Sequence, residues 1–221
     1  MNNIKGLLFD MDGVLFDTER VYLNTWIKVF HEHGYEMSKD VYISVMGTGR
    51  KNVKKVFLDA FGQDLPIDEM YKEKDELLLN VIKNGQVPLK LGAKELLSAA
   101  RKKGYKIALA TSAKRERLDI QLKTKNMEEY FNAIVCGDDV SKGKPDPEIF
   151  LKACYKLELK PENCIVIEDS LAGIKGAYNG KMMGFHVEDL KKADDEILKY
   201  CQKSFKSLLE IKQYLNLYHF V

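Results

Sequence analysis

Short apolar runs bounded by acidic residues or glycine recur along the chain. The runs cover Gly6–Phe9, Lys106–Ala110, Ala133–Cys136, Cys164–Ile167 and Met183–Val187. Hydrophobicity that is continuous over so few residues, instead of alternating, is typical of strands that are buried on both faces. The pattern therefore predicts five strands of a parallel sheet.

Segments with the apolar spacing of amphipathic helices lie between these runs. They cover Ala93–Lys103, Lys114–Lys125, Pro147–Lys156 and Ser170–Asn179. Strands and helices that alternate in this way predict a doubly wound, Rossmann-like α/β fold with right-handed crossovers. The last stretch, Asp194–Val221, is poor in strand signals, and we expect a helix in it around Leu208–Leu217.

The alternation stops between residues 17 and 87, where no strand-like run occurs. Helical segments follow one another instead, over Arg20–His33, Lys39–Ser44, Asn52–Phe61 and Ile67–Lys83. We therefore expect an all-helical domain over residues 17–87, inserted into an α/β core formed by residues 1–16 and 88–221. The chain is expected to leave and rejoin the core through hinge segments at Phe16–Glu19 and Asn84–Pro88.

Length and charge narrow the class of protein. The chain has 221 residues, which suits one large domain or one domain with a smaller insertion, and its net charge is only +2. That balance gives no electrostatic footprint for nucleic acid. No apolar run approaches the roughly 20 residues that span a bilayer, and the N-terminus does not resemble a secretory signal. We expect a cytoplasmic protein, by default a monomer, that binds neither nucleic acid nor membranes.

Polar residues concentrate where the predicted strands end. They are Asp10 and Asp12 after the first strand, Thr111 and Ser112 after the second, Lys144 after the third, and Glu168 and Asp169 after the fourth. Ligands of open parallel sheets bind outside these carboxyl ends. If the carboxylates converge, they form an all-oxygen site suited to Mg²⁺, while Lys144 and Thr111 can hold an anion. An anion site beside a reactive aspartate suits phosphoryl transfer through an aspartyl-phosphate.

Each of these features has an ordinary structural explanation when it is taken alone. Acidic residues before Gly13 also occur in strand-ending turns and in calcium loops. Lysine is a common solvated surface charge, and the polar residues after the second and fourth strands can cap the helices that follow. Capping does not explain why the first strand ends in two acids beside a glycine, so the co-occurrence at four strand ends favours a functional site.

In four ordered segments the sequence resembles the haloacid dehalogenase superfamily of phosphotransferases. The similarity is to its branch of helical-cap phosphatases and β-phosphoglucomutase-like proteins. The segments are Phe9–Glu19, Ala108–Ser112, Lys142–Pro147 and Ile167–Ile174. The resemblance extends over essentially the whole chain, and the helical insertion after the first segment agrees with it.

The resemblance implies a role for each matching residue. Asp10 would attack the phosphorus, and Asp12 would protonate the leaving alcohol and then activate water. Thr111 and Lys144 would hold the phosphate oxygens, and Lys144 would also shield Asp10 from its neighbours. The presence of Asp12 argues against haloacid dehalogenases and phosphonatase-type relatives, which lack this second acid or do not need it.

A Mg²⁺ ion is also implied by the resemblance. Its ligands would be Asp10, Asp169 and the backbone carbonyl of Asp12, with Glu168 as a further ligand or as a partner of a ligand. The expected cofactor is therefore Mg²⁺, and the expected partner is a small phosphorylated metabolite.

The choice of substrate is expected to rest with the helical cap. Gly47 and Arg50 fall where related caps present a loop to the substrate, and Arg50 suits a second anionic group or sugar hydroxyls. Ser112 and Lys114 can contact the substrate from the core. Lys74 lies in a highly charged helix and is expected on a solvated face.

The main hypothesis is a Mg²⁺-dependent phosphatase that hydrolyses a small phosphorylated metabolite such as a sugar phosphate. The alternative is a phosphohexomutase of the β-phosphoglucomutase type that uses the same aspartyl-phosphate. Tyr22 stands where β-phosphoglucomutases carry a hinge histidine, which favours hydrolysis. A third hypothesis, from another class, is a catalytically silent protein that binds sugar phosphates on this fold.

Overall fold

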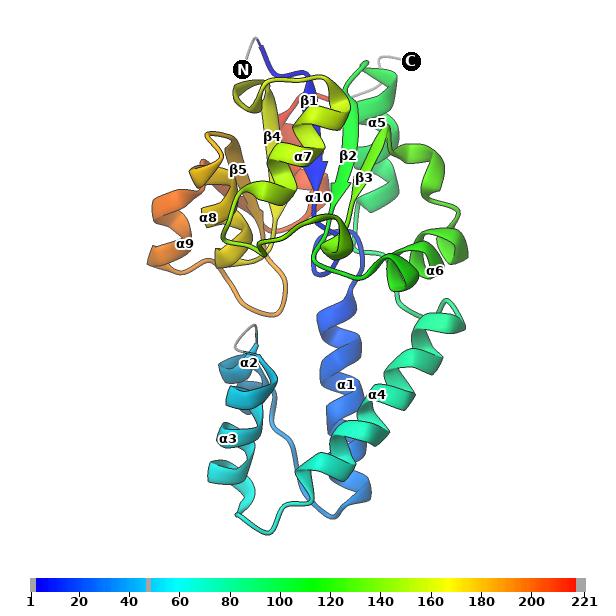
Figure 1. Cartoon of the computed structure of the whole chain (residues 1–221), viewed down its shortest axis with the longest axis vertical. Coiled ribbons are helices and arrows are strands. Elements are labelled where there is room, and N and C mark those ends of the chain that lie inside the picture. The colour runs from blue at the N-terminus through cyan, green and yellow to red at the C-terminus, as the bar shows by residue number, and fades with distance from the viewer. Residues whose placement is uncertain (1–2, 47–48, 218–221) are drawn as a thin grey trace. The chain divides into compact units, whose positions relative to one another are not determined.

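The chain divides into two compact units (Figure 1). The computed structural model describes residues 3–46 and 49–217. One unit joins Met1–Asp17 to Val87–Val221, and we call it the core unit. The other unit is Thr18–Gln86, which we call the helical unit.

The core unit is built on a six-stranded sheet in the order β3-β2-β1-β4-β5-β6, and all neighbouring strands are parallel. The strands are β1 (Gly6–Phe9), β2 (Lys106–Ala110), β3 (Ala133–Val135), β4 (Cys164–Glu168), β5 (Met183–Val187) and β6 (Lys203–Phe205). The helices of this unit are α5 (Ala93–Lys102), α6 (Arg115–Lys125), α7 (Glu148–Leu157), α8 (Leu171–Asn179), α9 (Asp195–Tyr200) and α10 (Leu208–Tyr214). The predicted doubly wound α/β fold is confirmed.

Burial on both faces explains why the apolar runs form the centre of this sheet. Every residue of β1 and β4 is buried, and these two strands lie side by side. On one face, Ile149, Phe150 and Leu157 of α7 pack against Leu8 of β1 and Val166 of β4. The carboxyl ends of β1 and β4 are therefore held in register by a fully apolar core.

The last strand was missed by the sequence prediction. β6 lies at the edge of the sheet, parallel to β5, within the stretch that was predicted to be poor in strands. Of its three residues only Phe205 is buried, and its ring lies 5.1 Å from that of Phe185. A three-residue edge strand with one buried side chain leaves no apolar run in the sequence.

The helical unit consists of α1 (Thr18–Glu32), α2 (Lys39–Val45), α3 (Arg50–Phe61) and α4 (Ile67–Lys83). All four helices were predicted, with ends that differ by at most two residues. Edge-to-face contacts hold α1, α3 and α4 together, because the Trp26 ring lies 5.2 Å from Phe57 and 4.8 Å from Tyr71. Such aromatic pairs stabilise a core beyond the area they bury.

The core unit contains both ends of the inserted segment. Phe16 forms an antiparallel bridge with Leu89, and the Asp17 N–H donates to the Pro88 carbonyl oxygen at 2.9 Å. The segment that leaves the core unit and the segment that returns to it thus pair with each other. An insertion whose ends are joined in this way leaves the pairing of β1 with its neighbours intact.

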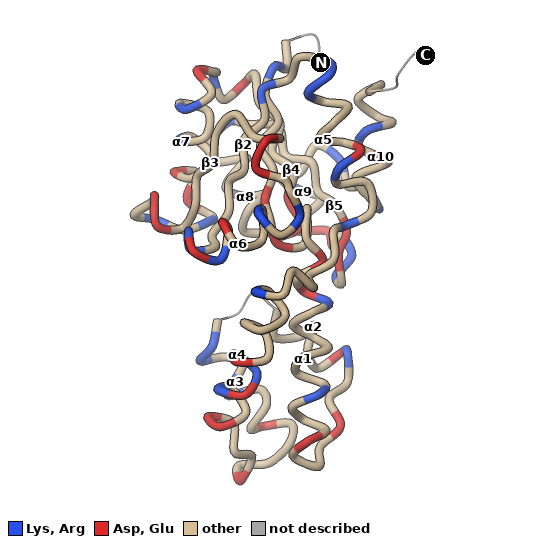
Figure 2. The backbone as a smooth tube through the Cα atoms, turned by 90° about the vertical axis from the view of Figure 1, so that its right-hand side faces the viewer, with Lys and Arg blue, Asp and Glu red and all other residues tan. Residues whose placement is uncertain are grey.

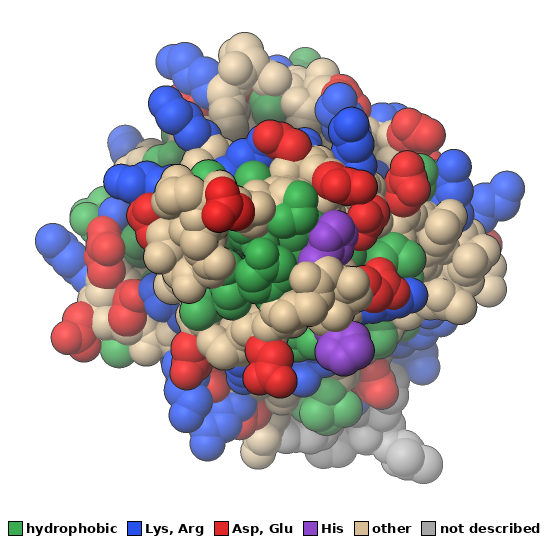
Figure 3. All heavy atoms as spheres, turned by 90° about the horizontal axis from the view of Figure 1, so that it is seen from below, with side chains coloured by type: hydrophobic (Ala, Val, Ile, Leu, Met, Phe, Trp, Pro, Cys, Tyr) green, Lys and Arg blue, Asp and Glu red, His purple; other side chains and the backbone are tan. Residues whose placement is uncertain are grey.

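Charges of both signs are interspersed along the backbone (Figure 2) and over the face drawn in Figure 3. The near-neutral net charge therefore reflects charges of both signs that lie near one another. Within residues 3–46 and 49–217, none of the helices combines the length and the apolar character needed to cross a bilayer.

Candidate active site

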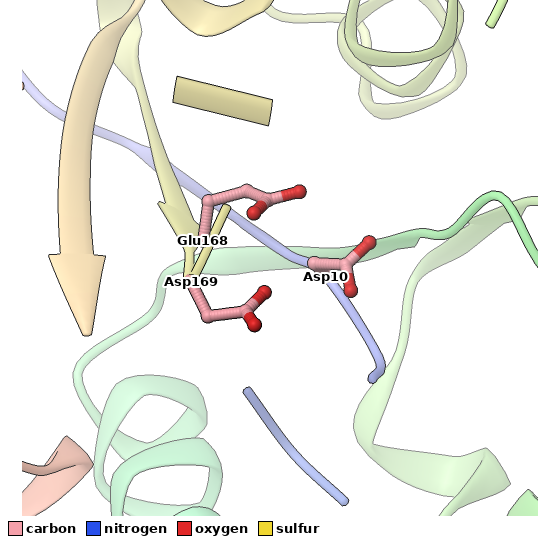
Figure 4. Close-up of side chains that lie close together, drawn as sticks. All are labelled: Asp10, Glu168 and Asp169. Carbon is pink, nitrogen blue, oxygen red and sulfur yellow. The ribbon is translucent and has the colours of Figure 1, made fainter. Parts of the chain in front are cut away.

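Three carboxylates meet at the carboxyl ends of β1 and β4 (Figure 4). Asp10 follows β1, Glu168 ends β4, and Asp169 comes next in the chain. Each offers a ligand oxygen, and these oxygens lie within 4.8 Å of one another. Opposite ligands of an octahedral Mg²⁺ are roughly 4.2 Å apart, so the donor set and its spacing fit a small divalent cation.

Two glycines make room for these carboxylates. Gly13 turns the chain after β1 with φ +73°, and a Cβ atom there would lie 2.2 Å from Asp169 Oδ2. A Cβ atom at Gly173, in the first turn of α8, would lie 1.9 Å from Glu168 Oε1. Both distances are far below van der Waals contact, so only glycine leaves the two acidic side chains where they are.

Lys144 brings a positive charge into this acidic cluster. Its side chain is only 7% exposed, and Nζ donates to Asp10 Oδ1, to Glu168 Oε1 at 2.7 Å and to the Ala110 carbonyl oxygen at 3.2 Å. The loop that carries Lys144 is fixed by Glu148, whose carboxylate accepts hydrogen bonds from the backbone preceding it. The sequence prediction that Lys144 approaches Asp10 agrees with this geometry.

Burial and charge change the acidity of these groups in opposite directions. Burial raises the pKa of Asp10 to about 7, with help from Glu168 and Asp12 and against the pull of Lys144. Burial opposes ionisation of Glu168 too, but the Lys144 charge and the Ser170 hydrogen bonds bring its pKa below the usual value. Burial likewise disfavours the Lys144 cation, yet Asp10 and Glu168 raise its pKa. A cation next to Asp10 would favour its ionised form.

Both oxygens of Glu168 already accept hydrogen bonds. Oε1 accepts from Lys144, and Oε2 accepts from the Ser170 backbone N–H at 2.7 Å and from its hydroxyl at 2.9 Å. The carboxylates of Asp10 and Asp169 flank the same space. Of the two roles left open by the sequence, this arrangement favours Glu168 as the partner that holds Lys144.

Residues after β2 lie on the same edge of the sheet. Thr111 is buried, and its Oγ1 accepts from the Ala113 N–H at 3.1 Å, while Ser112 is exposed. Lys114 is exposed and precedes the first turn of α6. Because β2 is the parallel neighbour of β1, the Thr111 hydroxyl follows the strand next to the one that ends at Asp10.

An arginine that the sequence prediction missed contacts Asp12. Arg117 of α6 forms a two-bond ion pair with this carboxylate: Nη1 donates to Oδ1 at 3.1 Å, and Nη2 donates to Oδ2. In the sequence, Arg117 lies among alternating charges that are typical of a solvated helix face. Its place in the first turn of α6, the helix that follows β2, was the only signal that could have indicated it.

A buried histidine also contacts the acidic cluster and was not predicted. His186 of β5 has no exposed surface, and its Nε2 lies 3.0 Å from the carbonyl oxygen of Asp169. Its Nδ1 lies 2.8 Å from the Ser204 hydroxyl. Burial lowers the pKa of His186, so the neutral ring is favoured, and it supports the backbone that carries Asp169.

The expected substrate residues of the cap belong to the helical unit. The guanidinium carbon of Arg50 lies 4.1 Å from the centre of the Tyr71 ring, and its Nη1 lies 3.6 Å from Asp75 Oδ2. The prediction of a solvated Lys74 is wrong, because Lys74 is 7% exposed and its Nζ lies 5.4 Å from the Tyr22 ring. The face of α4 that carries Lys74 packs on aromatic rings, which attract its charge. Gly47 lies outside the described residues.

The family model for haloacid dehalogenase-like hydrolases matches residues 7–187. The chain belongs to the haloacid dehalogenase-like hydrolases. That match covers β1 to β5, and so includes every strand end that contributes to the acidic cluster.

Relatives of this hydrolase include phosphatases. A phosphorylated carbohydrates phosphatase of Thermotoga maritima is 32% identical over 179 residues, 79% of this chain and 80% of the relative. A validoxylamine A 7'-phosphate phosphatase of Streptomyces hygroscopicus is 30% identical over 94% of this chain and 96% of its own. The structure of β-phosphoglucomutase from Clostridium difficile superposes with a TM-score of 0.69 at 25% identity, and covers 96% of each chain.

Gly173→Ala is expected to destabilise this hydrolase by about 1–3 kcal/mol, because the new methyl group would collide with the buried Glu168 carboxylate. A loss of stability is unusual for this substitution, since alanine in a helix is normally about 1 kcal/mol more favourable than glycine. Urea unfolding measures the change. In the control Gly143→Ala, the added Cβ meets no atom within 4 Å, and the free energy of unfolding should equal that of the wild-type protein. Equal stability of Gly173→Ala and wild type would contradict the packing argument.

Proposed function

We propose that this hydrolase is a Mg²⁺-dependent phosphatase that acts on a small phosphorylated metabolite, with sugar phosphates as the first class to test. The observation that carries the proposal is the juxtaposition of Asp10, Lys144 and the Glu168–Asp169 pair at the ends of two adjacent strands. A nucleophile, a buried cation and a set of oxygen ligands are the parts that transfer of a phosphoryl group requires.

In the proposed reaction, a carboxylate oxygen of Asp10 attacks the phosphorus, and the bond between phosphorus and the leaving oxygen breaks. Asp12 gives its proton to that oxygen, and the alcohol leaves. A water molecule then attacks the phosphorus of the aspartyl-phosphate while Asp12 takes up its proton. The bond between phosphorus and the Asp10 carboxylate oxygen breaks, inorganic phosphate leaves, and Asp10 returns to its starting state.

The surrounding residues hold the phosphoryl group and the charge. In this proposal Lys144, which contacts Asp10, binds a phosphate oxygen, and the hydroxyl of the buried Thr111 donates to another oxygen. Glu168 acts through Lys144, because its Oε1 accepts from Lys144 Nζ while its Oε2 accepts two hydrogen bonds from Ser170.

The cation would be held by Asp10, Asp169 and the backbone carbonyl of Asp12. When bound, Mg²⁺ supplies positive charge that favours the ionised nucleophile and offsets the charge of the phosphoryl oxygens. The cluster favours such charge, because the ligand oxygens of Asp10, Glu168 and Asp169 lie within 4.8 Å of one another and like charges at that distance repel.

Substrate selection is proposed to involve Ser112 and Lys114 from the core and Arg50 from the helical unit, whose guanidinium suits a second anion or sugar hydroxyls. The phosphorylated carbohydrates phosphatase among the relatives supports sugar phosphates as the substrate class. Hydrolysis is proposed over mutase activity because Tyr22 replaces the hinge histidine of β-phosphoglucomutases.

Removal of divalent cations is expected to abolish phosphate release. The test is a panel of sugar phosphates, nucleotides and phosphoglycolate, assayed with Mg²⁺ and again with excess EDTA. Turnover should fall by roughly a hundredfold or more in EDTA and return when Mg²⁺ is restored, because the buried negative charge is then no longer offset. Undiminished turnover in EDTA would contradict the metal assignment.

Conversion of β-glucose 1-phosphate to glucose 6-phosphate, stimulated by a bisphosphate, would favour the mutase instead.

A further inference from the structure

The ion pair between Arg117 and Asp12 joins α6 to the loop after β1. Two hydrogen bonds connect the groups, one from each terminal nitrogen of the guanidinium to a different carboxylate oxygen. Each side chain is 25% exposed, so the pair is not buried in the core. Solvent reaches both partners.

The two-bond geometry restricts the carboxylate more than a single contact does. A guanidinium is planar, and its parallel N–H groups fix both the position and the plane of a carboxylate. A single bond would leave rotation about the Asp12 Cβ–Cγ bond. Arg117 therefore defines which way the oxygens of Asp12 face, two residues beyond Asp10.

We infer that Arg117 is a positioning residue that orients Asp12 for proton transfer to and from the reacting oxygens. The inference rests on the proposed function, in which Asp12 protonates the leaving alcohol and later accepts a proton from water. Small errors in the placement of such a group reduce turnover strongly, because proton transfer requires hydrogen-bond distance and alignment.

A purely stabilising role fits the pair less well. Ion pairs with this degree of exposure contribute little to stability. The same helix offers a comparison, because Arg115 pairs with Asp139 at 2.8 Å and does not contact the acidic cluster in any described bond. Loss of either arginine removes one exposed ion pair from α6, but only Arg117 has Asp12 as its partner.

The inference predicts a dependence on the leaving group. Arg117→Met should lower kcat on a sugar phosphate by roughly tenfold to a hundredfold with little change in KM, since orientation and not binding is lost. A nitrophenolate leaves without protonation, so the first half of the reaction with p-nitrophenyl phosphate should be spared. The second half, in which Asp12 activates water, stays slow, and a burst of nitrophenolate equal to the enzyme concentration should appear.

A double-mutant cycle in Mg²⁺ tests the inference. The cycle compares the amplitude of the nitrophenolate burst and the rate at which the phosphorylated enzyme decays. Its members are Arg117→Met, Asp12→Asn and the double variant. If Arg117 acts through Asp12, its replacement has no further effect once Asp12→Asn is present. Arg117→Lys keeps the charge without the two-bond geometry and should be intermediate. Arg115→Met is the matched control and should turn over like wild type, and equal melting temperatures exclude unfolding.

Two results would overturn the inference while leaving the proposed function in place. One is that the effects of Arg117→Met and Asp12→Asn multiply; the other is that Arg117→Met raises KM and leaves kcat unchanged, which indicates direct contact with substrate. Failure of the proposed function has a different signature: wild-type protein with Mg²⁺ then releases no phosphate from any member of the panel, and the inference falls with it.

Discussion

Asp10→Asn is expected to abolish phosphate release from every substrate that the wild-type protein hydrolyses. The amide cannot act as the nucleophile, so no aspartyl-phosphate forms. The fold should remain, because asparagine has nearly the same size and Glu168 still pairs with Lys144 at 2.7 Å. Phosphate release and thermal unfolding, measured on the same preparation, check both parts of this expectation.

Asp12→Asn is the matched comparison for the nucleophile, since it changes an aspartate two residues away. It should still form phosphorylated enzyme from p-nitrophenyl phosphate, because that leaving group needs no proton. Mass spectrometry should then find phosphate on the peptide that contains Asp10. Substantial turnover by Asp10→Asn, or phosphate located on another residue, would refute the proposed nucleophile.

The central strands of the core sheet could be predicted from the sequence, because burial on both faces leaves an unbroken apolar run. β1 and β4 are buried along their whole length, and both were predicted with ends correct to one residue. β6 lacked that signal, because its place in the sheet is set by Phe205 packing on Phe185 and not by its own pattern. Edge strands are therefore the part of such a fold that local hydrophobicity specifies least.

The acidic cluster was predictable for a topological reason. Parallel strands bring their carboxyl ends to one edge, so Asp10 and Asp169 converge once β1 and β4 are known to be neighbours. Contacts made by long side chains were not predictable in this way. Whether Arg117 reaches Asp12, or Lys74 packs under Tyr22, depends on side-chain directions that spacing along a charged helix does not specify.

Lys144→Met is expected to reduce turnover by roughly a hundredfold or more and to destabilise the protein. Lys144 is the charge that lowers the pKa of Asp10, so without it the buried Asp10 takes up a proton at neutral pH and loses its nucleophilic form. Removal of one partner from a buried ion pair typically costs about 3–5 kcal/mol. Steady-state kinetics and urea unfolding measure the two effects.

Lys142→Met is the matched control for Lys144→Met, because Lys142 lies in the same loop but its side chain is 73% exposed. Its loss should change stability by less than about 1 kcal/mol and leave turnover unaltered. Wild-type kcat in Lys144→Met would show that this lysine neither activates Asp10 nor binds the phosphoryl group.

The response of the same variant to Mg²⁺ tests whether the cation binds at this cluster. Without Lys144, the carboxylates of Asp10, Glu168 and Asp169 lose the positive charge beside them, and a divalent cation can replace that charge by displacing the proton that Asp10 takes up. A divalent cation that binds them in the folded state but not in the unfolded chain should therefore raise the melting temperature of Lys144→Met more than that of wild type. Calorimetry with Mg²⁺ and with EDTA measures both shifts. Equal shifts in the two proteins would mean that binding of the cation does not depend on the charge of Lys144. The cation would then bind elsewhere.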